Sequence, residues 1–580
     1  MGTFTHDIRG DHLMKRALKN TGVILLTLFL LSSVTACCQN DGPGSEFIRS
    51  KGSNLVVGAE EEVIQLHGVG FVNDVGYLDY SNIAETTDHS EIDFQRIADM
   101  GMNVIRFELD YRFFEDDASP YVYQQQGWDW LDQEIGYASK YGVYLIFDMQ
   151  IPHGDVQLGP GNALWSDPEL QNRLKALWRA IAERYKDEPI VAAYDLVNEP
   201  YPTDGHHQWA TLAQELVDEI RSVDTNHLII VEESISTDPN GSFDFPSIND
   251  DNVMYDFHFY HPHRFTHSFI YRDNYGDGGF YPNPDVSLTN HYLTADVVWA
   301  DEVLTPKVPL GDSDWTLYES GVYEATDPMI VEVAPTFRCN VNQGTVYFDD
   351  FTIEEYDPDQ NLTRQIQVNI DHEDVWTLPT IDPLPSLAEE WIPWLEEGEQ
   401  GSHATASVGH LGNYALSISG VNQHYSLSNS GIGISVRTGY YYKISGWMKG
   451  EGVTDQSGQM GMDFFKHEST SDFTPLDNIY LEKAVMDKVR FLVDRNAPMN
   501  AGEFGTSIWT FRENLNGIAR NRGGLQWVRD MVDLFDQHNI NYQYFGYHSY
   551  CFGLYTNHGT LPDNASANQE LIDLLKELLQ

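Results

Sequence analysis

The chain has 580 residues, 41% of them hydrophobic and 13% aromatic, which is enough apolar material for roughly two to four folded domains and argues against disorder. Its 34 Lys and Arg stand against 88 Asp and Glu, a formal net charge of −54 at pH 7. A surface of this sign repels nucleic acid, anionic membranes and polyanionic substrates, so we exclude these partners and expect a neutral one. Adaptation to a saline medium, in which salt screens crowded carboxylates, accounts for the overall charge.

The N-terminal segment has the layout of an export signal. Basic residues precede an apolar run at 23–31 that is too short to span a bilayer. The run leads to Ser33-Val34-Thr35-Ala36-Cys37, which resembles the end of a bacterial lipoprotein signal; the alternative is a plain signal peptide cleaved before the cysteine. We therefore predict a signal peptide over 1–37, lipidation of Cys37, and a flexible linker over 38–53. The protein is expected outside the cytoplasm, lipid-anchored to the cell envelope or secreted, as a monomer that contacts membrane only through the anchor.

Short apolar segments alternate with amphipathic helical periodicity over two long stretches of the chain, a pattern typical of a parallel sheet. The helices are predicted around 92–100, 128–141, 168–185, 208–223, 476–493, 524–538 and 568–579. The strands are predicted at 63–71, 103–109, 143–149, 190–197, 228–232, 253–259, 499–503 and 542–547. Eight such strands predict an α/β fold, the (β/α)8 TIM barrel.

The alternation breaks in the middle of the chain. Between about 291 and 473, short alternating strands separated by Gly, Asp, Asn and Pro predict a β-sandwich of the jelly-roll kind. It is inserted between strands six and seven of the barrel. The predicted domains are therefore 54–290 and 474–580, the two parts of the barrel, and 291–473, the inserted sandwich.

Two glutamates follow predicted barrel strands. In Tyr194-Asp195-Leu196-Val197-Asn198-Glu199-Pro200 an apolar strand runs into Asn-Glu-Pro, which places Glu199 at the C-terminal mouth of strand four, where barrel enzymes carry catalytic groups. Asn500-Ala501-Gly502-Glu503-Phe504-Gly505 places Glu503 at the end of strand seven, and its glycines are expected to let a substrate approach closely. Two carboxylates about 5–5.5 Å apart across the mouth would act as a retaining glycoside hydrolase pair.

These strand ends resemble those of clan A retaining glycoside hydrolases, specifically glycoside hydrolase family 5, the cellulase and mannanase family. The resemblance covers about 55–291 and 473–580 and includes Gly101-Met102-Asn103-Val104-Ile105-Arg106 and His258-Phe259-Tyr260. It implies Glu199 as acid/base and Glu503 as nucleophile. The other residues to which it gives roles at the site are Arg106, which would orient the nucleophile and keep it ionised, Asn198, which would bind the sugar 2-hydroxyl, His258, and Tyr260, which would lie near the nucleophile.

Two positions depart from the family's pattern. The family usually has a histidine two residues after the aspartate of strand three, whereas Asp148-Met149-Gln150-Ile151-Pro152-His153 has Gln150 there and His153 three residues further on. Either side chain is a candidate for a sugar hydroxyl, and the choice stays open. The family also usually has a tryptophan at the end of strand eight as a floor for the −1 sugar. Tyr547-His548-Ser549-Tyr550 stands there, so we predict that Tyr547 and His548 contact the substrate.

The expected chemistry needs no metal or other cofactor. Burial and the negative charge of Glu503 are expected to raise the pKa of Glu199, so that Glu199 is protonated at rest. It would protonate the leaving oxygen while Glu503 attacks the anomeric carbon, and would then activate water. The histidines at 258, 261, 263 and 267 lack interleaved carboxylate or cysteine ligands and are not expected to bind zinc.

The insertion carries one motif of its own. Gly344-Thr345-Val346-Tyr347-Phe348-Asp349-Asp350-Phe351 resembles the closing strand of jelly-roll carbohydrate-binding modules of the family 4/9 kind. Such modules often hold a structural Ca²⁺ near these aspartates, which makes Asp349 and Asp350 candidate ligands; an exposed acidic strand end is the alternative. Whether the insertion binds glycan or shapes the cleft wall stays open.

We therefore predict a retaining hydrolase of a neutral β-linked polysaccharide, of the endo-β-1,4-glucanase (cellulase) type. A β-mannanase and an exo-β-1,3-glucanase on the same barrel are the alternatives, since these activities differ by loops that one sequence does not rank. A non-catalytic surface glycan-binding lipoprotein is the alternative from another class, and the presence of both glutamates argues against it.

Overall fold

The computed structural model divides the chain into two units, 1–41 and 42–580, and the residues it describes all belong to the second. The predicted signal peptide and Cys37 therefore lie outside the described residues. Within the described part of the chain, no helix is both long and apolar enough to cross a bilayer. The described residues are 46–73, 89–154, 163–235, 243–267, 279–283, 297–368, 392–395, 398–428, 434–455, 457–467, 476–511, 522–549, 551–556 and 566–579.

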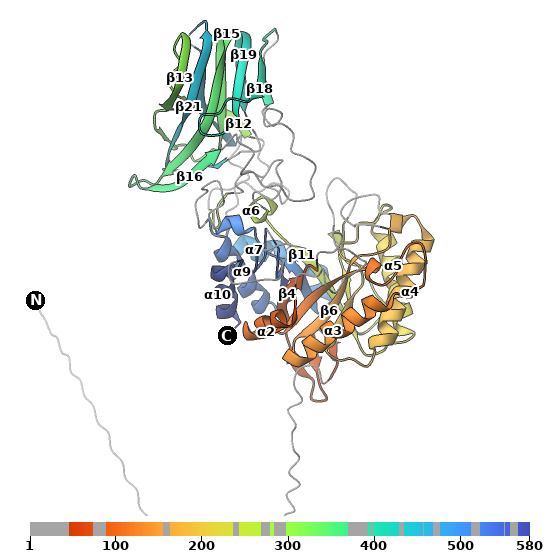
Figure 1. The fold of residues 1–580 in the computed structure, drawn as a ribbon. Coiled ribbons are helices and arrows are strands. Elements are labelled where there is room, and N and C mark those ends of the chain that lie inside the picture. Colours follow the sequence, from red (N-terminus) through yellow and green to blue (C-terminus); the bar gives the residue numbers. More distant parts are fainter. Residues whose placement is uncertain are drawn as a thin grey trace, which may run out of the picture. The chain divides into compact units, whose positions relative to one another are not determined.

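Eight parallel strands close into a barrel and follow one another around it in chain order (Figure 1). They are β4 (His67–Phe71), β5 (Val104–Asp110), β6 (Tyr144–Ile151), β7 (Val191–Asp195), β8 (Leu228–Glu232), β11 (Val253–Phe259), β23 (Met499–Phe504) and β24 (Asn541–Tyr544). Each overlaps one of the eight strands predicted from the sequence, so the TIM-barrel prediction is confirmed.

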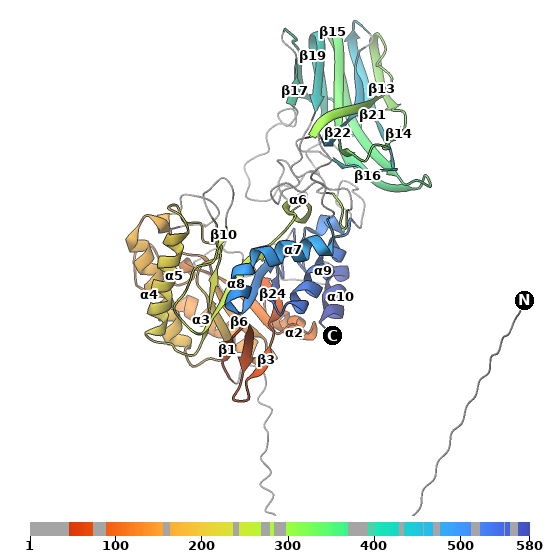
Figure 2. The same ribbon diagram turned by 180° about the vertical axis from the view of Figure 1, so that it is seen from behind.

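Helices cover the outside of the barrel (Figures 1 and 2). They are α2 (Glu91–Asp99), α3 (Gln125–Tyr141), α4 (Pro168–Tyr185), α5 (His206–Arg221), α7 (Asn478–Lys488), α8 (Arg490–Arg495), α9 (Gly524–Gln537) and α10 (Gln569–Leu578), with the short α6 (His263–Thr266) after β11. Local chemistry sets their ends: Asp167 caps α4 by accepting from the amide of Glu169, and Gly142 ends α3 in the left-handed conformation at φ 67°. The single helix predicted over 476–493 is two helices, because Val489 leaves the helical conformation between α7 and α8.

A small antiparallel sheet precedes the barrel. It consists of β1 (Ile48–Lys51), β2 (Asn54–Val57) and β3 (Glu62–Ile64). The predicted linker over 38–53 therefore extends too far, since β1 already begins at Ile48. The strand predicted over 63–71 is also two strands, β3 and β4, joined by a two-residue break.

The residues between β11 and β23 include an antiparallel domain, here called the β-domain, so an all-β insertion follows the sixth barrel strand as predicted. Its eleven strands form one hydrogen-bonded network with a hydrophobic core separate from that of the barrel. They are β12 (Val297–Leu304), β13 (Gly311–Glu319), β14 (Tyr323–Glu324), β15 (Ile330–Tyr356), β16 (Leu362–Val368), β17 (Ile392–Trp394), β18 (Ser402–Ala406), β19 (Ala415–Ser428), β20 (Ile434–Ser435), β21 (Tyr441–Val453) and β22 (Gln459–His467).

The strand β15 organises the β-domain. It runs for 27 residues, pairing with β22 over 330–338, with β19 over 336–348, with β21 over 345–356 and with β16 over 351–356. The register with β19 shifts around Asn342. The sequence predicted two short strands within this stretch, because the polar residues at 340–345 have the composition of a turn. Pairing with β19 keeps these residues extended, between the part of β15 that pairs with β22 and the part that pairs with β21.

Candidate active site

Several charged side chains lie inside the barrel because they belong to buried strands. Every residue of β5 and β23 is buried, so an arginine or glutamate in these strands must find partners inside the molecule. The resulting group is here called the Arg106 cluster. It consists of Arg106, Asp148, Asp195, Asn198, Glu199, Glu232, Asp256, His258, Tyr260 and Glu503.

Arg106 is the hub of this cluster and is only 1% exposed. Its Nη1 donates to Glu503 Oε1 at 3.1 Å, and its Nε donates to Asp195 Oδ2 at 3.1 Å. Its Nη2 donates to Asn198 Oδ1 at 3.0 Å and to Glu232 Oε1 at 2.8 Å. The guanidinium fork thus ties β5 to the ends of β7, β8 and β23 and contacts Glu503 directly.

The two glutamates meet at one imidazole. His258 Nδ1 lies 2.8 Å from Glu199 Oε1 and 3.5 Å from Glu503 Oε2. One side-chain nitrogen or oxygen atom from each of these three residues lies within 4.8 Å of the other two. A carboxylate oxygen of Glu199 is therefore within 4.8 Å of one of Glu503. Tyr260 donates its hydroxyl to Glu503 Oε2 at 2.9 Å. This spacing suits a retaining carboxylate pair, for which the carboxyl groups are about 5–5.5 Å apart.

The protonation of Glu199 differs from the prediction. Burial acts to raise the pKa of Glu199, but the hydrogen bond and the charge of His258 outweigh it and lower the pKa below its usual value. Burial likewise acts to lower the pKa of His258, but Glu503, Glu232 and Glu199 raise it well above its usual value. The expectation of a raised Glu199 pKa is therefore wrong, because His258 favours the ionised form of Glu199.

Four other acids of the cluster have their pKa shifted in the opposite direction. Burial raises the pKa of Asp148, Asp195 and Glu232, and nearby carboxylates add to that effect. Burial and the charge of Asp195 raise the pKa of Asp256 to about 7. Burial and Glu503 also raise the pKa of the Tyr260 hydroxyl, which keeps it a neutral donor. Perturbation of this kind, concentrated at strand ends, is typical of a functional centre.

The glycine before Glu503 has a role that the sequence did not reveal. Gly502 donates its amide to Asp256 Oδ1 at 2.6 Å, and a Cβ at this position would lie 2.0 Å from Asp256 Oδ2. A Cβ on Gly505 would lie 2.8 Å from the carbonyl oxygen of Phe545. The glycines therefore make room for neighbouring protein atoms, whereas the sequence suggested room for a substrate.

Glu232 is a member of the cluster that sequence reasoning missed. It ends β8, and its Oε2 accepts the backbone amide of Glu199 at 2.7 Å. Glu199 itself has a left-handed backbone with φ 43°, which is uncommon for a residue with a side chain. The available signal was a glutamate that ends the apolar run Leu-Ile-Ile-Val-Glu at a barrel mouth.

Of the two candidates for a sugar hydroxyl, His153 is out of reach of a substrate, and the role of Gln150 stays a prediction. His153 is fully buried, with Nε2 3.1 Å from Glu115 Oε2 and its ring centroid 4.3 Å from that of Tyr111. It belongs to a second group, here called the Arg173 cluster, which consists of Glu115, Asp117, His153 and Arg173. The substrate role predicted for His153 is therefore replaced by a structural one. Gln150 is half-buried, and its Oε1 accepts no hydrogen bond from the described residues.

The aromatic residue that follows β24 is Phe545. Tyr547 is fully buried and donates its hydroxyl to Asp93 Oδ1 at 2.7 Å, and His548 is 4% exposed and packs beside Phe71. The predicted substrate contacts of Tyr547 and His548 are therefore not supported. The strand ends at Tyr544, three residues earlier than predicted, and the next residue, Phe545, is half-buried with its ring 6.5 Å from that of Tyr260.

Asp349 and Asp350 do not fit the calcium site suggested by the sequence. Asp349 is buried and accepts the amides of Asp350 at 2.8 Å and His410 at 2.6 Å, one on each carboxylate oxygen. Asp350 Oδ2 lies 2.8 Å from His410 Nδ1. Calcium needs six to eight oxygen ligands, whereas these carboxylates already bind protein donors and fasten the segment around His410 to β15.

Comparison with known proteins agrees with this geometry. Residues 67–294 match the family model for cellulase, glycosyl hydrolase family 5. The chain is 31% identical over 179 residues to Endoglucanase C of Acetivibrio thermocellus, which covers 31% of this chain and 52% of that protein. It is 26% identical over 205 residues to Cellodextrinase A of Ruminococcus flavefaciens, covering 35% of this chain and 60% of that protein.

One solved structure that aligns along most of the chain is endoglucanase Cel5A from Thermotoga maritima, with a TM-score of 0.42 and 14% identity over 88% of this chain and 96% of that one. The chain spans only about half to three-fifths of the length of the two curated relatives. The range matched by the family model includes Arg106, Glu199 and His258 but ends before Glu503.

Proposed function

Because residues 67–294 belong to glycoside hydrolase family 5, we propose that this protein is a retaining hydrolase of β-linked glucan, of the endo-β-1,4-glucanase type. The observation that carries the proposal is the close approach of Glu199 and Glu503, whose carboxylate oxygens lie within 4.8 Å. The names of the relatives, an endoglucanase and a cellodextrinase, support a β-glucan as substrate. A β-mannanase or an exo-β-1,3-glucanase would use the same two carboxylates and is the alternative.

In the proposed mechanism Glu503 attacks the anomeric carbon. Arg106 and Tyr260 each donate to one of its oxygens and so hold it in place. Once substrate has displaced water, His258 passes a proton to Glu199. Glu199 then donates this proton to the leaving oxygen as the bond between that oxygen and the anomeric carbon breaks. In the second step water loses a proton to Glu199 and attacks the anomeric carbon, which releases Glu503 with overall retention.

Product analysis tests this function. The full-length protein is incubated with carboxymethylcellulose, lichenan, laminarin and mannan, and the first products are followed by NMR. We expect glucose-containing oligomers from the first two substrates, released initially as the β-anomer. Release of the α-anomer first would overturn the retaining mechanism, and release of mannose oligomers alone would overturn the substrate.

Phe545 is proposed as the aromatic floor for the sugar bound beside Glu503. It occupies the position after the last barrel strand at which the family usually has tryptophan, and it lies next to Tyr260. Since an aromatic contact contributes about 0.5–1.5 kcal/mol, we expect Phe545→Ala to raise KM up to about 10-fold. Phe545→Trp is the matched control and should keep KM near that of the parent. An unchanged KM in the alanine variant would contradict this assignment.

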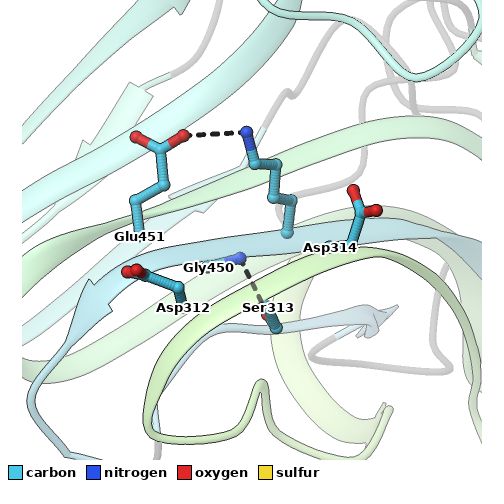
Figure 3. Close-up of a pocket in the computed structure, with 6 residues that line it drawn as sticks. Asp312, Ser313, Asp314, Gly450 and Glu451 are labelled. Atoms are coloured by element: carbon cyan, nitrogen blue, oxygen red, sulfur yellow. Dashed lines mark hydrogen bonds and ion pairs between the residues drawn. The ribbon is translucent and has the colours of Figure 1, made fainter.

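The β-domain is proposed to bind glycan. A pocket of about 500 Å³ opens between β13 and β21, lined by Asp312, Ser313, Asp314, Lys449, Gly450 and Glu451 (Figure 3). Half-buried rings adjoin it: Trp315 follows Asp314, and Tyr347 donates its hydroxyl to Glu451 Oε2 at 3.0 Å. The ring centroids of Trp315 and Tyr347 are 6.4 Å apart. Rings beside charged hydrogen-bonding groups suit a neutral sugar.

Affinity electrophoresis in gels containing β-glucan tests this surface. The protein carries Glu503→Gln so that the gel is not digested. We expect Trp315→Ala to remove the retardation, whereas Trp299→Ala, an exposed tryptophan on β12, should leave it unchanged. Equal retardation of both variants would contradict a site at this pocket.

Export with lipid attached to Cys37 is proposed from the sequence alone. Radiolabelled palmitate should enter the parent protein, and Cys37→Ala should abolish that label. A labelled Cys37→Ala variant would contradict lipidation at this residue.

A further inference from the structure

One carboxylate connects the groups assigned to the two halves of the reaction. The side chain of Glu232 is 2% exposed. Its Oε2 accepts the backbone amide of Glu199 at 2.7 Å, and its Oε1 accepts Arg106 Nη2 at 2.8 Å. The same Oε1 lies 3.7 Å from His258 Nε2. Glu232 therefore contacts the backbone of the proposed acid/base, the arginine that orients the proposed nucleophile, and the imidazole between them.

The geometry at Glu232 requires an acceptor at both oxygens. Two donors converge on the side chain, one from Arg106 and one from the amide of Glu199. A carboxylate accepts at both oxygens, whereas a glutamine amide offers one acceptor and one donor. In either orientation the glutamine would direct its NH₂ group at one of these donors and leave that buried donor without an acceptor, which is unfavourable.

The bond from the Glu199 amide to Glu232 matters because the backbone of Glu199 is strained. At φ 43° the residue occupies a region that side-chain-bearing residues rarely adopt, and such a conformation persists only where surrounding contacts hold it. The bond from the Glu199 amide to Glu232 is such a contact. If it is lost, the backbone is free to relax, and the Glu199 carboxyl moves relative to His258 and the scissile bond.

We propose that Glu232 is a positioning residue, which fixes the strained backbone of Glu199 and ties it to Arg106 so that acid/base and nucleophile keep one geometry. This proposal rests on the proposed glycoside hydrolase function. The charged groups that face Glu232 come from β5 (Arg106), β7 (Asp195), the segment after β7 (Glu199) and β11 (Asp256 and His258). Glu232 itself does not touch substrate in this assignment.

Substitution of Glu232 should damage the acid step more than the nucleophile. Glu232→Gln and the parent are assayed on aryl β-cellobiosides whose phenols range from poor to good leaving groups. A misplacement of about 1 Å costs about 10²-fold, so we expect kcat to fall by about 10²-fold on phenyl β-cellobioside with KM nearly unchanged. Dinitrophenyl β-cellobioside needs little proton donation, and the loss there should be less than about 10-fold. An equal loss on all leaving groups, or no loss, would overturn the proposal.

Glu115→Gln is the matched control. Glu115 is also a buried glutamate that binds an arginine, a histidine and a backbone amide, those of Arg173, His153 and Tyr121, but it bonds to no member of the Arg106 cluster in the described structure. It should lower thermal stability without any leaving-group dependence. If Glu232→Gln does not fold, Glu232→Asp, which keeps two acceptor oxygens on a shorter arm, should show the same dependence at smaller amplitude; a Glu232→Asp variant with parental kinetics would overturn the proposal.

Crystal structures of the variants separate this inference from the proposed function. In Glu232→Gln we expect Glu199 to leave the left-handed backbone region, and in Glu115→Gln to keep it. A Glu199 that keeps its φ and its bond to His258 without Glu232 would overturn the positioning role, whatever the activity. A parent protein that cleaves no aryl cellobioside and no β-glucan would instead refute the proposed function.

Discussion

Two groups of ionisable side chains in the barrel share their residue types but differ in charge balance. In the Arg173 cluster two carboxylates, Glu115 and Asp117, face one arginine and one histidine. Burial acts to raise the pKa of both carboxyls, but the bonds they accept outweigh it and leave both pKa values below their usual range. The pKa of His153 is lowered, chiefly by burial.

The Arg106 cluster gathers more acid than its bases can match. Arg106 and His258 face six carboxylates: Asp148, Asp195, Glu199, Glu232, Asp256 and Glu503. There burial raises the pKa of four of these acids, while the carboxylates around His258 raise its pKa. Residue type alone therefore does not mark an active site. The excess of buried carboxyl groups marks it, because burying them lowers the free energy of unfolding. Such an excess persists where carboxylates carry out chemistry.

The largest expected contrast is between the glutamates bound by the two arginines. Glu503→Gln removes the proposed nucleophile, so turnover on β-glucan should fall by on the order of 10⁶-fold, the scale found when a covalent nucleophile is lost. Glu115→Gln should leave turnover unchanged and lower the melting temperature, since it breaks a buried ion pair worth about 3–5 kcal/mol. Initial rates and thermal unfolding of both variants measure this. Substantial turnover by Glu503→Gln would contradict the assignment of the Arg106 cluster as the active site.

The two histidines give the next contrast. His258 is expected to hold the proton that Glu199 delivers, so His258→Asn should lower kcat by about 10³-fold, within the range for general acid–base groups. Its pH profile should also change, because the group whose pKa the carboxylates raise is gone. His153→Asn alters a buried contact with Glu115 and should affect stability alone. Equal kcat values for the two variants would show that charge excess does not distinguish the clusters.

Local patterns were enough to predict the barrel and its principal residues. Each of the eight strands is an apolar run beside an amphipathic helix, and a polar residue at the end of such a run must face the mouth. Glu199 and Glu503 were predicted in this way, whereas Arg106 and His258 were predicted from the resemblance to the family. Glu232 obeys the same rule, but it carries no motif of its own, and only its bond to the Glu199 amide shows its importance.

What the sequence did not reveal depends on distances. The direction of the Glu199 pKa follows from a 2.8 Å contact with His258, a residue 59 positions away. The roles of His153 and Tyr547 depend on which way each side chain points, and both turn into the protein, toward Glu115 and Asp93. Phe545 was missed because β24 ends three residues earlier than its apolar pattern suggested. The 27 residues of β15 stay extended because other strands pair along its length, with β19 continuing across the polar stretch at 340–345.

The smallest expected contrast is the pH dependence of stability. The folded pKa of Asp256 is about 7, raised by burial and by Asp195, against about 3.9 in an unfolded chain. Between these values the folded state binds the proton more tightly, so this group makes the free energy of unfolding decrease as pH rises from about 4 to about 7. Glu115, with its lowered pKa, acts in the opposite direction: its contribution is complete above about pH 4.3 and is lost as pH falls through its folded pKa.

Asp256→Asn should remove the decrease in unfolding free energy between pH 4 and 7. Glu115→Gln should remove the loss of unfolding free energy at low pH. A shift of about three pH units corresponds to about 4 kcal/mol, and coupling with neighbouring acids spreads the titration. We therefore expect the unfolding free energy of Asp256→Asn, relative to the parent, to be about 2 kcal/mol higher at pH 8 than at pH 4. The hydrogen bonds from Gly502 and Asn500 that the substitution alters affect both pH values alike. Urea unfolding of the parent and both variants from pH 3 to pH 8 measures this. A variant whose unfolding free energy keeps the parental slope between pH 4 and 7 would mean that Arg106 and His258 already neutralise Asp256. The two clusters would then differ in the number of their acids but not in the stability those acids cost.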